Sequence, residues 1–181
     1  MSRIGNEIIT LPAGVTVEVK DEVITVKGPK GTLSQSYDPV ITPHIEGNVI
    51  HFTRANNQGD VKAKHGLYRA LTMNMVKGVT EGYKKSLIVN GVGWKVAKQG
   101  KKVVLNVGFS HPVDVEEEDG ITLDCPSATE ITVSGISKEK VGQFAAMVRG
   151  IREPEPYHGY GIRYNDEVIE RKVGKAAGGK G

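Results

Sequence analysis

The amino-acid sequence contains the same kind of segment twice, and this repeat restricts the possible folds more than any other feature. The pentapeptide ITVKG at residues 24–28 returns as ITVSG at residues 131–135. Each copy follows another alternating segment, VTVEV at 15–19 and ITLDC at 121–125. Apolar and polar residues that alternate with a period of two, with many β-branched side chains, are typical of half-buried strands. Because a helical pattern follows each copy, the repeat predicts two similar domains.

The two helical patterns each have the spacing of an amphipathic helix. The first is predicted over residues 60–77, where Leu67, Leu71 and Met75 recur at intervals of four. The second is predicted over residues 138–149. Its apolar residues follow the i, i+3, i+4, i+7 spacing of a helix with one buried face, and they are Val141, Phe144, Ala145 and Val148.

The order of these patterns predicts the fold class. Strands grouped before one helix in each half favour an antiparallel α+β fold over alternating βαβ units. We therefore predict two tandem repeated domains, each an antiparallel β-sheet packed against one α-helix, over residues 1–82 and 83–173. The second domain opens with additional strand patterns at residues 86–109. Residues 174–181 offer no core-forming side chain, and we predict a flexible basic tail there.

Composition and charge exclude several classes of protein. The chain has 181 residues and one cysteine, Cys125, so no intrachain disulfide can form. No apolar run approaches the ~20 residues of a membrane span, and the N-terminus lacks the apolar core of a signal peptide, so we expect a cytoplasmic protein. The net charge is only +3, but residues 84–102 contain six basic side chains and no acidic one. Such a block produces a local field that favours a polyanionic partner, although a solvated surface without a partner has the same pattern.

The sequence contains no set of residues that indicates catalysis or a metal site. The five histidines are scattered, and none has another histidine or cysteine at ligand spacing. GxSxG and HExxH motifs are absent. Residues 174–181, GKAAGGKG, match a phosphate-loop pattern, but the chain ends where a helix and a serine or threonine are needed. We therefore expect no catalytic residue, metal or cofactor, and we keep two alternatives open: an enzyme, and a protein–protein module that uses its sheet edges.

The segment REPEPYHGYGIRY at residues 152–164 has the composition of an RNA-binding loop. Pro154 and Pro156 prevent the preceding helix from continuing, and Gly159 and Gly161 permit positive φ or a close backbone approach. Aromatic rings stack on bases or riboses, and arginine pairs with phosphate in a forked geometry. The candidate contacts are Arg152, Tyr157, His158, Tyr160, Arg163 and Tyr164. The alternative is a surface loop whose tyrosines pack on their own domain.

Several long motifs, in the same order along the chain, resemble the bacterial ribosomal protein L-six family, the universal large-subunit protein six. The motifs are MSRIG and LPAGV near the N-terminus, VKGPKGTLS at 26–34, HGLYRALTMNMVKGVTEGY at 65–83, GVGWKV at 91–96, LNVGFSHPV at 105–113, ITVSGISKEKVGQFAAMVR at 131–149 and EPEPYHGYGIRY at 153–164. The similarity extends from residue 2 to about residue 175. Members commonly have lysines on both sides of the middle glycine of the last motif, where His158 and Tyr160 stand here.

This resemblance implies a structural, non-catalytic protein of the large ribosomal subunit in the cytoplasm. It implies direct binding of 23S rRNA, mainly by the second domain, near the base of the factor-binding stalk and the tRNA acceptor side of the peptidyl-transferase region. The implied partners are large-subunit rRNA and neighbouring ribosomal proteins, with no membrane and no free homo-oligomer. The rRNA-binding residues that we expect are Lys95, Arg152, Tyr157, His158, Gly159, Tyr160, Gly161, Arg163, Tyr164, Arg171, Lys172 and Lys175.

Overall fold

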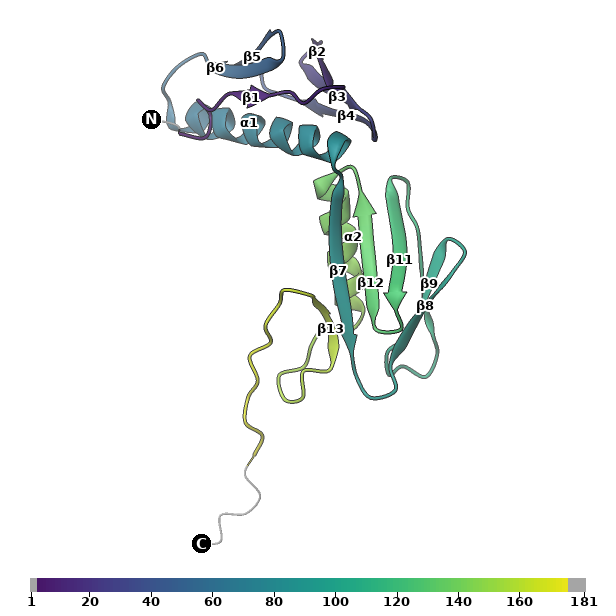
Figure 1. The fold of residues 1–181 in the computed structure, drawn as a ribbon. Helices are drawn as coiled ribbons and strands as arrows, with labels where there is room; N and C mark the ends of the chain where they lie inside the picture. The colour runs from purple at the N-terminus through teal and green to yellow at the C-terminus, as the bar shows by residue number, and fades with distance from the viewer. Residues whose placement is uncertain (1–2, 176–181) are drawn as a thin grey trace, which may run out of the picture. The chain divides into compact units, whose positions relative to one another are not determined.

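The computed structural model describes residues 3–175 and divides the chain into two compact units (Figure 1). The first unit runs to Tyr83 and includes Ile136–Lys138, and the second contains Lys84–Gly135 and the residues from Glu139 onward. Both units combine antiparallel sheets with one helix, which confirms the predicted α+β fold with two repeated domains. Except for Gly174 and Lys175, the predicted tail lies outside the described residues. Among residues 3–175, no helix combines the length and the hydropathy that a membrane span requires.

The first unit contains two three-stranded sheets. One has the strand order β1-β6-β5, with β1 at Ile9–Thr10, β6 at Val49–Arg54 and β5 at Ile41–Glu46. The other has the order β2-β3-β4, with β2 at Thr16–Lys20, β3 at Val23–Gly28 and β4 at Gly31–Ser36. The helix α1, Gly59–Thr80, contacts strands of both sheets and closes the core of this unit.

The second unit contains one three-stranded and one four-stranded sheet. The smaller has the order β10-β9-β8, with β10 at Val113–Glu116, β9 at Lys102–Asn106 and β8 at Lys95–Gln99. The larger has the order β11-β12-β7-β13, with β11 at Ile121–Ser127, β12 at Glu130–Gly135, β7 at Tyr83–Asn90 and β13 at Gly161–Tyr164. The helix α2, Lys138–Ile151, lies behind β7 and β12 in Figure 1, and all four residues of its predicted apolar face are buried.

The strand order shows which segments of the two units are equivalent. In each unit, one sheet joins the first strand to the two strands before the helix, β1-β6-β5 and β7-β12-β11. The three strands in between form the other sheet. The ITVSG strand β12 is therefore equivalent to β6, whereas the ITVKG strand β3 is equivalent to β9. The repeat exists in the fold, but the pairing of the two pentapeptides is wrong. The strands over residues 95–116 are equivalents of β2–β4 rather than additions, and the additional strand is β13.

The buried face of α1 overlaps only in part with the predicted one, because Met75 is buried and Leu71 is half-buried, whereas Leu67 lies outside it. Leu67 is 50% exposed. The buried residues of α1 include Val61, His65, Thr72, Met75, Val76 and Val79. The two polar residues among them are tolerated because each is hydrogen-bonded. Nε2 of His65 donates to the Phe52 carbonyl at 2.9 Å, and the Thr72 hydroxyl donates to the Tyr68 carbonyl at 2.8 Å. Because His65 and Thr72 are polar, a search for periodic apolar residues does not identify them as core residues.

We expect the substitution Gly5→Ala to destabilise the first unit. A Cβ at this position would lie 2.5 Å from Nδ1 of His65, and that ring is fixed by Phe52 and by Nη1 of Arg54 at 3.2 Å. Overpacking of this kind typically lowers the free energy of unfolding by about 1–3 kcal/mol. Urea denaturation measures the loss. Gly59→Ala is the control, because a Cβ there meets open space, and equal effects of the two variants would contradict the packing role of Gly5.

Candidate nucleic-acid interface

Strand β13 places the predicted loop beside the end of β7 (Figure 1). Gly161 pairs with Asn90 in the antiparallel register of these two strands. The Asn90 side chain adds a link, because its Nδ2 donates to the Gly159 carbonyl at 3.1 Å. The loop over residues 152–160 therefore lies beside the turn that follows β7, although the two segments are about 65 residues apart in sequence.

One carboxylate organises this loop. Glu155 accepts hydrogen bonds from the backbone N–H groups of Tyr157 and His158, both at 2.7 Å, and of Tyr160 at 3.2 Å. Burial acts to raise the pKa of the Glu155 carboxyl, but the three backbone bonds and the nearby His158 outweigh it, so that the pKa lies below its ordinary value. Two backbone bonds, from Glu155 to Tyr160 and from Gly159 to Glu155, close the turn. The loop is therefore held in one shape by its own acidic residue.

Four aromatic rings gather around Arg152, and we call Trp94, Phe109, Arg152, His158 and Tyr160 the aromatic surface. The guanidinium carbon of Arg152 lies 5.7 Å from the ring centroid of Trp94 and 5.1 Å from that of Phe109. Both distances fall in the range of cation–π attraction. The rings of His158 and Tyr160 are stacked at 5.3 Å with an interplanar angle of 19°, and Tyr160 lies 6.3 Å from Trp94. Arg152 is nevertheless exposed to solvent.

The aromatic surface borders a depression of about 500 Å³. Its lining residues are Trp94, Arg152, Glu153, Glu155, His158 and Tyr160. Nδ1 of His158 lies 3.7 Å from the Glu155 carboxylate, close enough for an ion pair when the imidazole is protonated. A hollow with flat rings and a held guanidinium is suited to a planar, electron-rich group that carries negative charge beside it.

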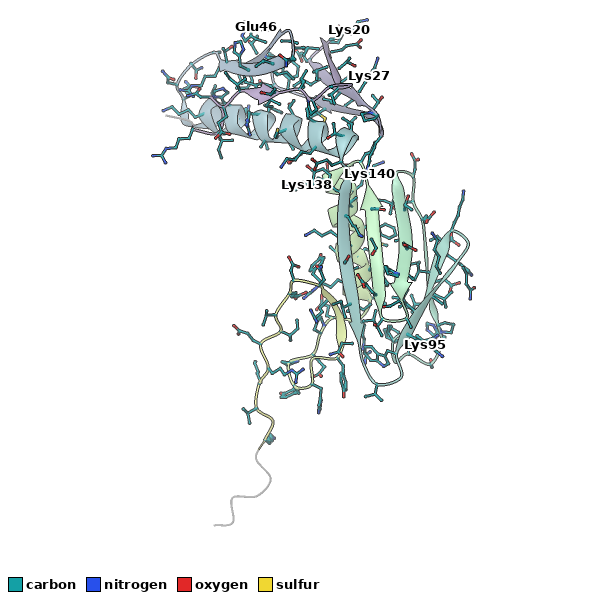
Figure 2. All side chains as sticks on the ribbon, in the orientation of Figure 1. Lys20, Lys27, Glu46, Lys95, Lys138 and Lys140 are labelled. Atoms are coloured by element: carbon teal, nitrogen blue, oxygen red, sulfur yellow. The ribbon has the colours of Figure 1, made fainter. Side chains whose placement is uncertain are left out.

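Other predicted contacts lie near this surface. Lys95 is exposed at the start of β8, at the end of the second unit where the β7–β8 turn lies (Figure 2). Tyr157 is 55% exposed. The Arg171 guanidinium lies next to Gly159, since a Cβ on that glycine would be 3.4 Å from Nε. The backbone N–H of Lys172 donates to the Pro156 carbonyl at 2.7 Å, which joins the C-terminal segment to the loop, and Lys175 is exposed.

The two glycines of the loop serve the protein backbone in this structure. Gly159 is buried and has φ of +74°, a left-handed conformation that favours glycine. Gly161 is also buried, and a Cβ there would lie 2.5 Å from both N and Cα of Pro154. In this structure, Gly161 therefore permits close packing against the backbone of Pro154, and Gly159 permits the turn of the loop.

Arg163 and Tyr164 lie farther along β13, away from the aromatic surface. Nη1 of Arg163 donates to the carbonyls of Tyr164 at 3.1 Å, Asn165 at 3.4 Å and Glu167 at 3.1 Å. The Tyr164 ring has Lys85 Nζ at 5.3 Å and the Arg149 guanidinium at 5.9 Å from its centroid. Both side chains are half-buried. Through these contacts, both side chains stabilise the turn that follows β13.

The same turn contains an ion pair that makes its stability depend on pH. Arg149 donates to both carboxylate oxygens of Glu167, at 3.0 and 2.6 Å. These bonds lower the pKa of Glu167 below its ordinary 4.5 in spite of partial burial. A lowered pKa contributes stability above about pH 4.5, and the contribution is lost as pH falls through the folded-state value. We expect Glu167→Gln to cost about 1 kcal/mol at pH 7 and less at pH 3. Urea midpoints at both pH values check this, and an equal cost at pH 3 would contradict it.

Sequence reasoning missed Phe109 and gave Trp94 no role of its own. The packing of Trp94 could have been inferred from the glycines near it. The Trp94 indole packs directly against Gly91 and Gly108, where a Cβ would collide with the ring. The glycines of the motifs GVGW and NVGF therefore leave room for the Trp94 ring. Phe109 follows Gly108 directly in the sequence. Glu155 was missed because its role is to bind backbone, which no residue spacing reveals.

The described residues hold no group that suits catalysis. Over residues 3–175, no cluster of three or more histidine, cysteine, aspartate or glutamate side chains is arranged to hold a metal ion. Cys125 is half-buried, and burial together with Asp124 raises the pKa of its thiol, which makes it a poor nucleophile. Neither a metal centre nor a reactive thiol therefore accompanies the aromatic surface in the described part of the chain.

Comparison with known proteins identifies extended similarity. A family model described as "Ribosomal protein L6" matches residues 11–82 and 90–165. Large ribosomal subunit protein uL6 of Lacticaseibacillus casei is 55% identical over 175 residues, which cover 97% of this chain and 98% of that protein. The uL6 protein of Caldicellulosiruptor bescii is 54% identical over 181 residues, which cover 99% of this chain and 100% of that protein. The uL6 protein of Carboxydothermus hydrogenoformans is 51% identical over 181 residues, which cover 100% of this chain and 99% of that protein.

Proposed function

The chain belongs to the ribosomal protein L6 family, a family of structural, non-enzymatic proteins of the large ribosomal subunit, and on this basis we propose that it binds 23S rRNA directly through the aromatic surface. The binding is positional: the loop and the rings hold one local RNA conformation, and no bond is made or broken. The chain acts as a structural constituent of the subunit.

The exposed, pre-positioned guanidinium of Arg152 is the observation that carries this proposal. Its guanidinium carbon lies within cation–π distance of two rings, and among residues 3–175 no carboxylate forms an ion pair with it. An arginine that only stabilised the fold would use its donors on the protein, as Arg163 and Arg149 do. Arg152 instead presents a flat, weakly hydrated cation to solvent, which suits phosphate or a nucleobase face.

The surrounding residues complete the proposed interface. Lys95, Arg171, Lys172 and Lys175 supply positive charge for phosphates, which gives affinity without sequence information. Trp94, Tyr157, His158 and Tyr160 offer faces for bases or riboses. The Glu155 carboxylate and Gly159 and Gly161 shape the loop that carries them. Arg163 and Tyr164 hold the turn after β13 and contribute to binding indirectly, through the position of that strand.

The family resemblance suggests where this interface lies in the subunit. We place it near the base of the factor-binding stalk, on the tRNA acceptor side of the peptidyl-transferase region, with the second domain as the main rRNA contact. Neighbouring large-subunit proteins are the remaining partners, and ribosomes of the cytoplasm are the site of action. His158 and Tyr160 occupy positions that are commonly lysine in the family, so stacking replaces part of the usual electrostatic contribution here.

A filter-binding titration of the purified chain with 23S rRNA tests the proposal. We expect saturable binding that 16S rRNA competes for poorly, with an affinity that falls linearly on a log–log plot as salt is raised. A protein–protein module would bind its partner with little dependence on salt. Equal competition by both rRNAs, or a salt-independent affinity, would contradict direct and specific rRNA binding.

A further inference from the structure

Two histidines of the first unit, far from the aromatic surface in sequence, lie directly opposite each other on neighbouring strands. His44 of β5 and His51 of β6 are cross-strand partners in the antiparallel register. Their rings are stacked with centroids 4.8 Å apart and an interplanar angle of 17°. Seven positions separate them in sequence, a spacing that matches no metal-ligand pattern, which is why the sequence did not reveal the pair.

The position of the pair leaves it open to solvent ligands. The register places both histidines on the face opposite Ile50 and Phe52, which are buried in the core. Both imidazoles are half-buried. The hairpin that carries them ends at Glu46, which is labelled in Figure 2, and Glu46 lies on the same face of β5 as His44 because side chains two apart share a face. A cation bound at the pair is therefore close to a negative charge.

One ring nitrogen of His44 has a supporting oxygen. Nε2 of His44 and the Thr53 hydroxyl share a hydrogen bond at 2.8 Å, and the same hydroxyl lies within 3.4 Å of the Thr42 carbonyl, to which it can donate. When the hydroxyl donates to that carbonyl, the neutral imidazole of His44 carries its proton on Nε2 and a free lone pair on Nδ1. This is the arrangement of a metal-ligating histidine, whose other nitrogen donates to a supporting oxygen. Over residues 3–175, neither ring nitrogen of His51 has a hydrogen-bond partner.

We propose that His44 and His51 form a two-histidine site for a divalent transition-metal ion of the zinc and nickel class. Two imidazole nitrogens bound to one tetrahedral zinc at about 2.0–2.1 Å are roughly 3.4 Å apart. The stacked rings are at 4.8 Å, so the two side chains must rotate out of the stack for one nitrogen of each to reach that separation and point its lone pair at a common ion. Imidazole suits zinc, copper and nickel rather than magnesium or calcium. Because no group of three protein ligands exists in the described part of the chain, water completes the coordination and the site is exchangeable.

Isothermal titration of the tag-free chain with nickel chloride and with zinc chloride at pH 7.5 tests this site. We expect one ion per chain. His44→Gln and His51→Gln should each weaken binding by more than about tenfold, and Thr53→Val by about tenfold through the lost support of Nε2. His111→Gln is the matched control, because it removes an exposed imidazole that has no histidine partner.

The outcomes separate the site from simple ring stacking. Isotherms of His44→Gln and His51→Gln that match the wild type would overturn the proposal. A loss in His111→Gln as large as in His51→Gln would also overturn it, because binding would then come from isolated imidazoles. Circular dichroism of each variant checks that the half-buried pair is replaced without loss of the fold. The measurement needs no RNA, so its result is independent of the proposed rRNA interface.

Discussion

Arg152→Ala should weaken binding of the chain to 23S rRNA by at least about tenfold. The side chain carries a planar charged group that lies within cation–π distance of Trp94 and Phe109. Contacts to a charged group contribute about 1.5–3 kcal/mol each, and 1.4 kcal/mol is a factor of about ten in affinity. Loss of one phosphate contact should also reduce the slope of log affinity against log salt by roughly 0.7–0.9. Filter binding at four salt concentrations measures both quantities.

Two further variants separate charge from stacking. Arg152→Lys keeps the charge but not the planar fork, so we expect the salt slope to be retained while part of the affinity is lost. Lys101→Ala is the control, because Lys101 is an exposed cation at the turn between β8 and β9, at the opposite end of β8 from Lys95. If Lys101→Ala reduced affinity as much as Arg152→Ala, binding would depend on total charge and not on the aromatic surface.

Gly161→Ala should cause a large loss of stability in the second unit and disturb the loop. A Cβ there would lie 2.5 Å from backbone atoms of Pro154, and φ is +156°. Backbone cannot move aside as a flexible side chain can, so we expect a loss of about 3 kcal/mol from overpacking and backbone strain together. Because Gly161 begins β13 and pairs with Asn90, rRNA binding should weaken as well. Urea denaturation and filter binding of the same preparation measure the two effects.

Gly142→Ala is the matched control for this prediction. Gly142 lies within α2, and a Cβ there meets nothing within 4 Å. Alanine is the better helix former by about 0.8–1.0 kcal/mol, so this variant should be as stable as the wild type or more stable. A Gly161→Ala protein with the urea midpoint of Gly142→Ala would show that the chain relaxes around the added methyl group, contrary to the packing described here.

The fold class could be predicted from the sequence because period-two and helical patterns are local signals. Which strands of the two domains are equivalent could not be predicted from the sequence. ITVKG and ITVSG are similar in sequence, yet β12 buries three consecutive residues whereas β3 alternates. The true equivalents, ITVKG and KVVLN, share only the alternating pattern of burial. The buried face of α1 was misjudged for a related reason. His65 and Thr72 become core residues only through hydrogen bonds that the fold supplies.

The sequence predicted some residues of the candidate site, and the structure adds others. The segment 152–164 contains the loop, and Arg152, His158 and Tyr160 lie together in it, as side-chain chemistry suggested. Trp94 and Phe109 join them through strand pairing at long sequence separation, which no local pattern encodes. The inward role of Gly161 and the carbonyl bonds of Arg163 likewise depend on tertiary geometry. Residue type predicted the chemistry of the site, and the topology determined which residues share it.

Sedimentation of a tagged copy in cell lysate, through a sucrose gradient before and after a high-salt wash, tests the central claim most directly. If the chain is a structural constituent that contacts 23S rRNA, it should remain with large subunits after the wash, and the Arg152→Ala protein should be removed more readily. A wild-type chain that is washed off completely, or that stays at the top of the gradient, would contradict the account.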